Sequence, residues 1–311
     1  MAHKAPGKHY RRGISLVKLM EMFPDDATAE AWFASVRWDG KPVCPFCESE
    51  RVRTVPNRKP MPYRCRDCRK HFSVKHGTVM QSSKLGCRVW AIAVYLLTTG
   101  IKGTSGMKLH RDLDVTYKTA WHLAHRIRKA FPEVMATFAG PVEVDETAIG
   151  GLEKNKHANK KTRQGRGTVG KTIVVGVLDR PTNQVVAGTV AEADARTLQG
   201  KVLDATDTTA QVYTDDAGAY RGIARKHEAV SHSTGEYVRE QAHTNGIESF
   251  WALLDRGIMG TFHHVSPKHL DRYVTEFAGR HNQRPLDTVS QMERVAGGMV
   301  GERLRYRDLT N

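Results

Sequence analysis

The chain has 311 residues, of which 48 are Lys or Arg and 33 are Asp or Glu, and its formal net charge is +15. A chain of this length can form two or three compact units, each with a core of its own. Such an excess of positive charge favours a polyanionic partner, because binding releases condensed counterions, although it is also compatible with a generic solubilising surface.

The sequence contains no run of about 18 apolar residues, so no segment is expected to span a membrane. Its basic N-terminus, MAHKAPGKHYRRG, is not followed by the apolar stretch of a secretory signal. We therefore expect a cytoplasmic, nucleoid-associated protein without a membrane partner, in which thiols stay reduced.

The pattern of apolar residues predicts helices at the start of the chain. Residues 14–36 are amphipathic, and this helical segment is closed by the sequence RWDG at 37–40. We assign residues 1–40 to an N-terminal helical segment.

Residues 41–80 contain two C-x₂-C pairs, with the 17 residues 48–64 between them. The four thiols are those of Cys44, Cys47, Cys65 and Cys68. This spacing is typical of a four-thiolate zinc site, and two short strands between the pairs would complete a zinc ribbon. Four Cys ligands leave no open position, so a structural Zn²⁺ is expected rather than a catalytic one.

Ordinary reduced thiols or a redox C-x-x-C are the alternatives to zinc. The fifth cysteine, Cys87, lies beside an apolar helical run and is expected to be a packed residue. Basic residues surround both pairs, so we expect the ribbon to touch the DNA backbone, with a solvated charged face as the alternative.

Residues 81–135 predict a helix-turn-helix. Two helical patterns meet at the sequence LDV, 113–115, and Thr116 is placed to cap the second. The second helix has an apolar stripe and a basic, hydrogen-bonding surface, the arrangement that enters a major groove. A packed helical hairpin with a solvated face is the alternative. The residues assigned to that polar surface are Tyr117, Lys118, His122, His125, Arg126, Arg128 and Lys129, and those assigned to DNA are Lys118, His122 and Arg126.

From Pro141 onward β-branched runs alternate with helical patterns, which predicts a mixed α/β domain over residues 140–290 and a C-terminal tail over 291–311. Between the first two strands lies a Gly- and Lys-rich loop, residues 151–171. Lys160 and Lys161 of this loop are expected to grip the DNA backbone, unless the loop is simply solvated.

Two of the predicted strands end in a carboxylate, Asp145 and Asp215. Asp216 competes for the second position, but successive strand residues point to opposite faces, and we choose the residue nearer the strand. A third acid, Glu248, lies on a helix at the edge of its apolar stripe. Three converging carboxylates would suit Mg²⁺, which prefers oxygen ligands; taken singly, each is compatible with an ordinary cap or surface acid.

These motifs resemble those of bacterial insertion-sequence transposases of the DDE type, in the group with an N-terminal zinc ribbon and an ISXO-type transposase domain. The matching residues include RWDGKPVCPFC, YRCRDCRKHFSVKHGTVM, LDVTYKTAWHLAHRIRKA, VEVDETAIGG and HTNGIESFWALLDRGIMGTFHHVSPKHLDRYVTEFAGRHNQR. They cover nearly all of residues 14–284, and the last motif is the most specific.

The resemblance implies a ribonuclease H-like DDE catalytic domain at 140–290, in which Asp145, Asp215 and Glu248 bind Mg²⁺ or Mn²⁺. Asn245 is the rival for the third position. The family usually has Lys or Arg seven residues beyond Glu248, where it would hold a phosphate, but this chain has Asp255 there. The adjacent Arg256 is assigned to DNA as its substitute.

The implied activity is that of a transposase that binds the terminal inverted repeats of an insertion sequence and target DNA, and that catalyses two-metal strand cleavage and strand transfer. Synapsis of two ends implies a homo-oligomer. Two alternatives stay open: a catalytically inactive zinc-ribbon regulator that only binds DNA, and a ribonuclease H-like nuclease that only hydrolyses.

Overall fold

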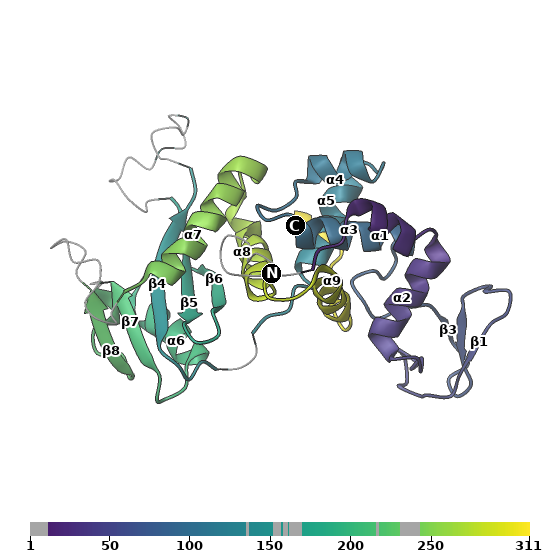
Figure 1. The fold of residues 1–311 in the computed structure, drawn as a ribbon, viewed down its shortest axis with the longest axis horizontal. Helices are drawn as coiled ribbons and strands as arrows, with labels where there is room; N and C mark the ends of the chain where they lie inside the picture. Colours follow the sequence, from purple (N-terminus) through teal and green to yellow (C-terminus); the bar gives the residue numbers. More distant parts are fainter. Residues whose placement is uncertain are drawn as a thin grey trace, which may run out of the picture. The chain divides into compact units, whose positions relative to one another are not determined.

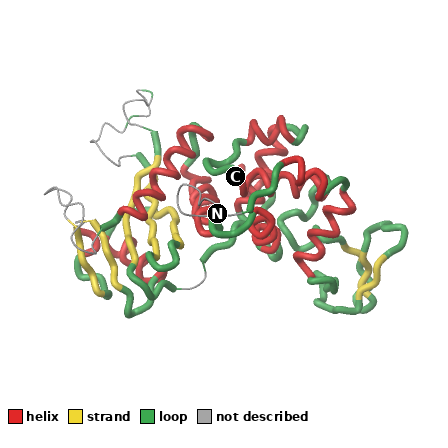
Figure 2. The backbone as a smooth tube through the Cα atoms, in the orientation of Figure 1, coloured by secondary structure: helices red, strands yellow, loops and turns green. Residues whose placement is uncertain are grey.

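The structure is a computed structural model that describes residues 12–134, 137–151, 157, 161, 170–215, 218–230 and 243–311. The chain divides into two compact units: residues 1–132 with 283–311, and residues 133–282. Figure 2 shows a small sheet and many helices in the first unit, and a larger sheet in the second. None of the helices in the described ranges is long and apolar enough to cross a membrane.

The first unit is mainly helical (Figure 1). Side chains cap several of its helices, since Ser15, Asp25, Ser105 and Thr116 each accept an N–H from the following turn. The helices are α1 Leu16–Met22, α2 Asp26–Trp38, α3 Cys87–Thr99, α4 Gly106–Asp112, α5 Tyr117–Arg128, α9 Thr288–Gly297 and α10 Tyr306–Thr310.

The predicted helical segment 14–36 contains two helices. Helix α1 ends before Phe23, and Asp25 begins α2 by accepting the N–H of Thr28 at 2.7 Å. Pro24 lies between the two, where proline has no N–H to continue a helix. The two short helices pack through Leu19, Phe23 and Phe33 into the core of this unit.

A three-stranded antiparallel sheet in the order β1-β2-β3 forms the ribbon, from β1 Val52–Thr54, β2 Tyr63–Cys65 and β3 His71–Phe72. The ring of Trp38, at the end of α2, packs edge-on against Tyr63 and Phe72. An ion pair between Arg58 and Glu30 also joins the ribbon to α2.

The end of the chain belongs to the first unit. Residues 291–311, predicted as a C-terminal tail, contain most of α9 and all of α10. The side chains of Val295, Met299 and Leu309 are buried, and the N–H of Val79 donates to the carbonyl of Met299 at 3.0 Å. This segment is therefore part of the helical core.

The second unit is built on a five-stranded sheet in the order β6-β5-β4-β7-β8 (Figure 1). Strands β4, β5 and β6 are antiparallel neighbours, whereas β7 and β8 are parallel to β4. This mixed sheet confirms the predicted α/β class. The elements are β4 Val142–Ile149, β5 Thr172–Asp179, β6 Gln184–Val190, α6 Ala195–Ala205, β7 Gln211–Asp215, the 3₁₀ turn η3 Gly218–Tyr220, β8 Lys226–Val230, α7 Asn245–Gly257, the π-helical turn η5 Ile258–Phe262 and α8 Pro267–Asn282.

Helices cover both faces of this sheet. Val142 and Val144 of β4 lie in one apolar core with Leu198 and Val202 of α6. A second core joins the other face to α7 and α8 through residues such as Phe250. Because side chains alternate along a strand, Glu143 and Asp145, each next to one of these valines, face α7.

Candidate functional site

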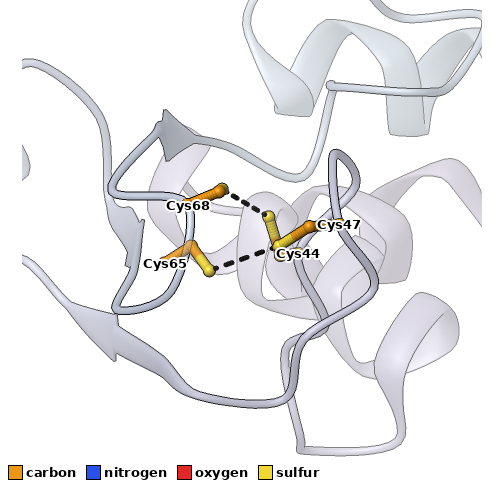
Figure 3. A group of neighbouring side chains, drawn as sticks. All are labelled: Cys44, Cys47, Cys65 and Cys68. Atoms are coloured by element: carbon orange, nitrogen blue, oxygen red, sulfur yellow. Dashed lines mark hydrogen bonds between the residues drawn. The ribbon is translucent and has the colours of Figure 1, made fainter.

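The four predicted zinc ligands form one cluster (Figure 3). Their Sγ atoms all lie within 4.8 Å of one another, and the Cys44–Cys68 and Cys47–Cys65 pairs are 3.6 and 3.7 Å apart. Four sulfurs at the usual Zn–S distance of about 2.3 Å from one tetrahedral ion would be about 3.8 Å apart. The geometry therefore fits Zn²⁺ and supports the prediction of a structural site.

The turns of the ribbon are shaped for this cluster. Glu48 and Arg69, each immediately after a C-x₂-C pair, have left-handed backbones with φ of 58° and 61°. Burial opposes ionisation of the Cys65 thiol, but the N–H groups of Cys68 and Asp67 lower its pKa to about 6. Cys87 lies outside the cluster, and burial raises its pKa to about 11.

Asp145 and Asp215 lie at the same level on adjacent strands. Strands β4 and β7 are parallel, and Glu143 is paired with Tyr213. Asp145 and Asp215 each lie two residues beyond this pair, so the two aspartates are neighbours on one face of the sheet. Burial and the charge of Asp215 raise the pKa of Asp145 to about 7. The Oδ1 atom of Asp215 is buried and has no hydrogen-bond partner among the described residues.

A tryptophan of α7 contacts this pair of acids. The indole Nε1 of Trp251 donates to Oδ2 of Asp145 at 3.0 Å. Gly176, which faces Asp145 on β5, makes room for the indole, since a Cβ at that position would lie 2.8 Å from the ring of Trp251. The sequence pattern assigned Trp251 only to the apolar stripe of the helix.

Glu248 and Asn245 both begin α7 and are exposed. Glu248 lies one turn before Trp251, and its Oε1 accepts the hydroxyl of Thr244 at 2.8 Å. Among the described residues, the four cysteines are the only set of potential metal ligands whose donor atoms all lie within 4.8 Å of one another. The carboxylates of Asp145, Asp215 and Glu248 are therefore not all within this distance of one another. Asp216 lies outside the described residues.

Glu143 anchors the start of α7, a role that sequence analysis missed. It is 2% exposed, and its Oε2 accepts the N–H groups of Gly246 and Ile247 at 2.7 and 3.1 Å. Arg180 donates to the other oxygen at 2.8 Å and to the carbonyl of His243 at 2.6 Å. From the face of the sheet that α7 covers, the carboxylate therefore caps the helix and is favourably placed for its dipole.

Glu146, the residue after Asp145 on β4, is another acid that the sequence did not identify as part of the site. The hydroxyl of Tyr220 donates to its Oε2 at 2.8 Å. Burial and the charge of Asp215 raise the pKa of Glu146, although the bond from Tyr220 partly offsets this. Asp145, Glu146 and Asp215 thus form a concentration of negative charge.

Further along α7, Asp255 and Arg256 are both exposed. Neighbouring protein atoms still shield the carboxylate of Asp255 partly from water and raise its pKa, and the charge of Lys171, just before β5, opposes this shift. Of the loop lysines assigned to DNA, Lys160 lies outside the described residues, and Lys161 is exposed.

Helices α4 and α5 form the predicted pair, and Thr116 caps α5 as expected. Lys118 is exposed, and His122 and Arg126 are half-buried. The assignment of His125 and Arg128 to the polar surface of α5 was wrong, because they are 0% and 1% exposed. His125 instead packs against Trp121, with ring centroids 4.5 Å apart.

Comparison with known proteins identifies the family. Residues 24–71 match the transposase zinc-ribbon domain, and residues 137–282 match the ISXO2-like transposase domain. The chain is 31% identical over 275 residues, 83% of its length, to a protein described as uncharacterized in transposable element ISH50 of Halobacterium salinarum, 91% of which is covered. The chain belongs to this transposase family. The matched domains correspond to the cysteine cluster and to the sheet that carries the paired aspartates.

Replacement of one ribbon cysteine is expected to remove zinc. In Cys65→Ser, the zinc content of purified protein should fall from about one ion per chain to near zero, and the ribbon should unfold because metal binding supplies its folding free energy. Cys87→Ala should retain zinc, since this thiol lies outside the cluster. Full zinc content in Cys65→Ser would contradict the assignment.

Without Mg²⁺ or Mn²⁺, the zinc-loaded protein should lose stability as the pH rises from about 4 to about 7. The pKa of Asp145 is raised to about 7 in the folded state, so the folded protein binds more protons than the unfolded chain in this window. The loss should be at most on the order of 4 kcal/mol, measured by urea unfolding of the zinc-loaded protein without Mg²⁺ or Mn²⁺ at pH 5 and pH 8. Asp145→Asn should flatten the profile, and equal pH slopes in both proteins would refute this origin.

Glu143→Gln should destabilise the second unit by about 3 kcal/mol. The variant removes the anionic partner of the Arg180 guanidinium and weakens the cap of α7. Denaturant unfolding measures this loss. Glu228→Gln changes an exposed glutamate of β8 and should cost less than about 0.5 kcal/mol. Similar stabilities of the two variants would show that the cap contributes little.

Proposed function

We propose that the chain is the transposase of an insertion sequence, which binds the ends of the element and catalyses metal-dependent DNA cleavage and strand transfer. The observation that carries the proposal is the pair Asp145 and Asp215, held at one level on adjacent parallel strands of the domain that matches the family. Family membership supports a DNA substrate, and the net charge of +15 is consistent with one.

The donor set at the paired aspartates fits a hard divalent cation. Carboxylate oxygens are the ligands that Mg²⁺ prefers, with Mn²⁺ as the alternative, and Asp215 has a buried oxygen without a hydrogen-bond partner among the described residues. Burial, and then the charge of Asp215, raise the pKa of Asp145, and a cation bound there would favour the ionised carboxylate. Asp145 and Asp215 are therefore our proposed metal ligands.

Glu248 is our proposed third ligand, ahead of Asn245. Glu248 lies three residues before Trp251, which touches Asp145, whereas Asn245 lies six residues before it. Residues three apart on a helix share a face, so Glu248 is on the side of α7 that meets the aspartates. The bond from Thr244 holds its carboxylate against the first turn of the helix.

Asp145, Asp215 and Glu248 would hold the divalent cations, whose charge would stabilise the attacking and leaving oxygens of an in-line displacement at phosphorus. The protein's own part is to keep the acids in place: Trp251 orients Asp145, and Glu143 fixes the start of α7. In cleavage the nucleophile is water, and in strand transfer it is the 3′-hydroxyl of the cut end. Because only the nucleophile differs, the same acids serve both reactions, and no covalent protein intermediate is needed.

The test is cleavage and strand transfer by purified protein on duplexes taken from the DNA that flanks its coding region. Asp145→Ala, Asp215→Ala and Glu248→Ala should each lower the Mg²⁺-dependent rate by more than about a hundredfold, since even the supporting partners of metal ligands cost up to that amount. Each variant should still bind the duplex, because the proposed DNA contacts lie on other residues.

Asn245→Ala is the matched control on α7 and should retain most of the rate. Loss of activity in Asn245→Ala with retention in Glu248→Ala would reassign the third ligand. Hydrolysis of pre-cut ends without joining to a second duplex would contradict a transposase and favour a nuclease. Binding without any cleavage by the wild type would favour a regulator.

A further inference from the structure

The polar side of α5 is partly covered by residues 302–308, which we call the C-terminal strap. The carbonyl of Leu304 accepts Nε2 of His122 at 3.2 Å and Nε of Arg126 at 3.1 Å. The Nζ atom of Lys118 lies 4.3 Å from the ring centroid of Tyr306. All three α5 residues that were assigned to DNA thus contact the strap.

The strap is a fixed part of the first unit. Leu304 and Leu309, at its middle and just beyond its end, are 5% and 1% exposed. Glu302 forms an ion pair at 2.7 Å with Lys129, the residue that follows α5. Release of the strap would expose both leucines to water, so its contacts with α5 are expected to persist when the protein binds a partner.

The outer side of the strap presents arginine. Arg303, Arg305 and Arg307 are exposed, and they alternate with Leu304 and Tyr306, which face the protein. Arg305 is paired with Asp308 at 2.9 Å. Among the ion pairs found in the described residues, none includes Arg303 or Arg307.

Positive charge therefore accumulates where the strap meets α5. Six cations and two acids, Glu302 and Asp308, leave a surplus of four positive charges, and both acids are already paired. Burial lowers the pKa of Arg126, and the charge of Arg303 lowers it further. Such repulsion disfavours the folded state unless a polyanion relieves it. The cations are Lys118, Arg126, Lys129, Arg303, Arg305 and Arg307.

We propose that the C-terminal strap is a phosphate-contacting DNA-binding element, in which Arg303 and Arg307 bind the backbone of the duplex that α5 approaches. Guanidinium groups match phosphate oxygens in a bidentate geometry, and phosphate contacts fix orientation without reading sequence. The inference rests on the proposed function in that the polyanion is DNA. On this proposal, some of the DNA contacts first assigned to His122 and Arg126, which are half-buried, are made by the strap.

The test measures DNA binding as a function of salt for the full-length chain and for the double variant Arg303→Ala/Arg307→Ala. Affinity should fall about tenfold, equally for a duplex from the flanking DNA and for one of unrelated sequence, since backbone contacts are independent of sequence. The slope of log K against log salt should decrease in magnitude by about two, one for each phosphate that the variant no longer neutralises.

The control is Arg294→Ala/Arg196→Ala, which removes two exposed arginines outside the strap. It should leave affinity and slope near the wild-type values. Equal losses of affinity in both double variants would show that only net charge matters and would overturn the proposal. Unchanged or tighter binding by the strap variant would also overturn it, and tighter binding would show that the strap blocks DNA from α5.

The strap proposal and the transposase assignment are tested by different measurements, DNA affinity and DNA cleavage. The strap variant is expected to lose affinity for DNA, whereas Asp145→Ala is expected to keep affinity and to lose cleavage. A wild type that binds DNA with the predicted arginine dependence but never cleaves would sink the enzymatic assignment alone. A wild type that cleaves while the strap variant binds normally would sink the strap proposal alone.

Discussion

The geometry of the acidic site depends on the hydrogen bonds that the buried carboxylate of Glu143 accepts from the start of α7. Glu143 joins strand β4 to the first turn of α7, and it lies two residues before Asp145 on the same face of the strand. One residue therefore sets the position of the helix that carries Glu248 and Trp251 relative to the sheet. Gly246 is required by this closeness, since a Cβ there would lie 2.8 Å from Oε2 of Glu143.

Because α7 is fixed in this way, the second unit can hold like charges together in a partly buried place. Arg180 compensates Glu143, but Asp145, Glu146 and Asp215 have no comparable cationic partner among the described residues. Hydrogen bonds from Trp251 and Tyr220 offset part of the repulsion. The remaining cost reduces stability, and uncompensated charge of this kind is more typical of functional sites than of structural ones.

Local patterns predicted those features that depend on neighbours in sequence. The spacing of the cysteines predicted the sulfur cluster, and the position of a carboxylate at the end of a predicted strand selected Asp145 and Asp215, which lie on paired strands. Contacts between distant segments were not predictable in this way. Glu143 and Gly246 are 103 residues apart, and nothing local to either identifies the other as its partner. His125 carries a polar side chain on a basic helix, so its complete burial follows only from the packing of the whole unit.

The two concentrations of charge in this chain have opposite signs and lie in different compact units. The carboxylates of the second unit would be neutralised by divalent cations, and the arginines at the strap would be neutralised by phosphates. Phosphate oxygens themselves bind divalent cations, so DNA at the acids would add metal ligands there. A ligand that binds only the folded state stabilises that state, and a ligand that relieves like-charge repulsion gains affinity by doing so. On the proposed function, the unfavourable charge distribution of the free protein would therefore contribute directly to its affinity for metal and DNA.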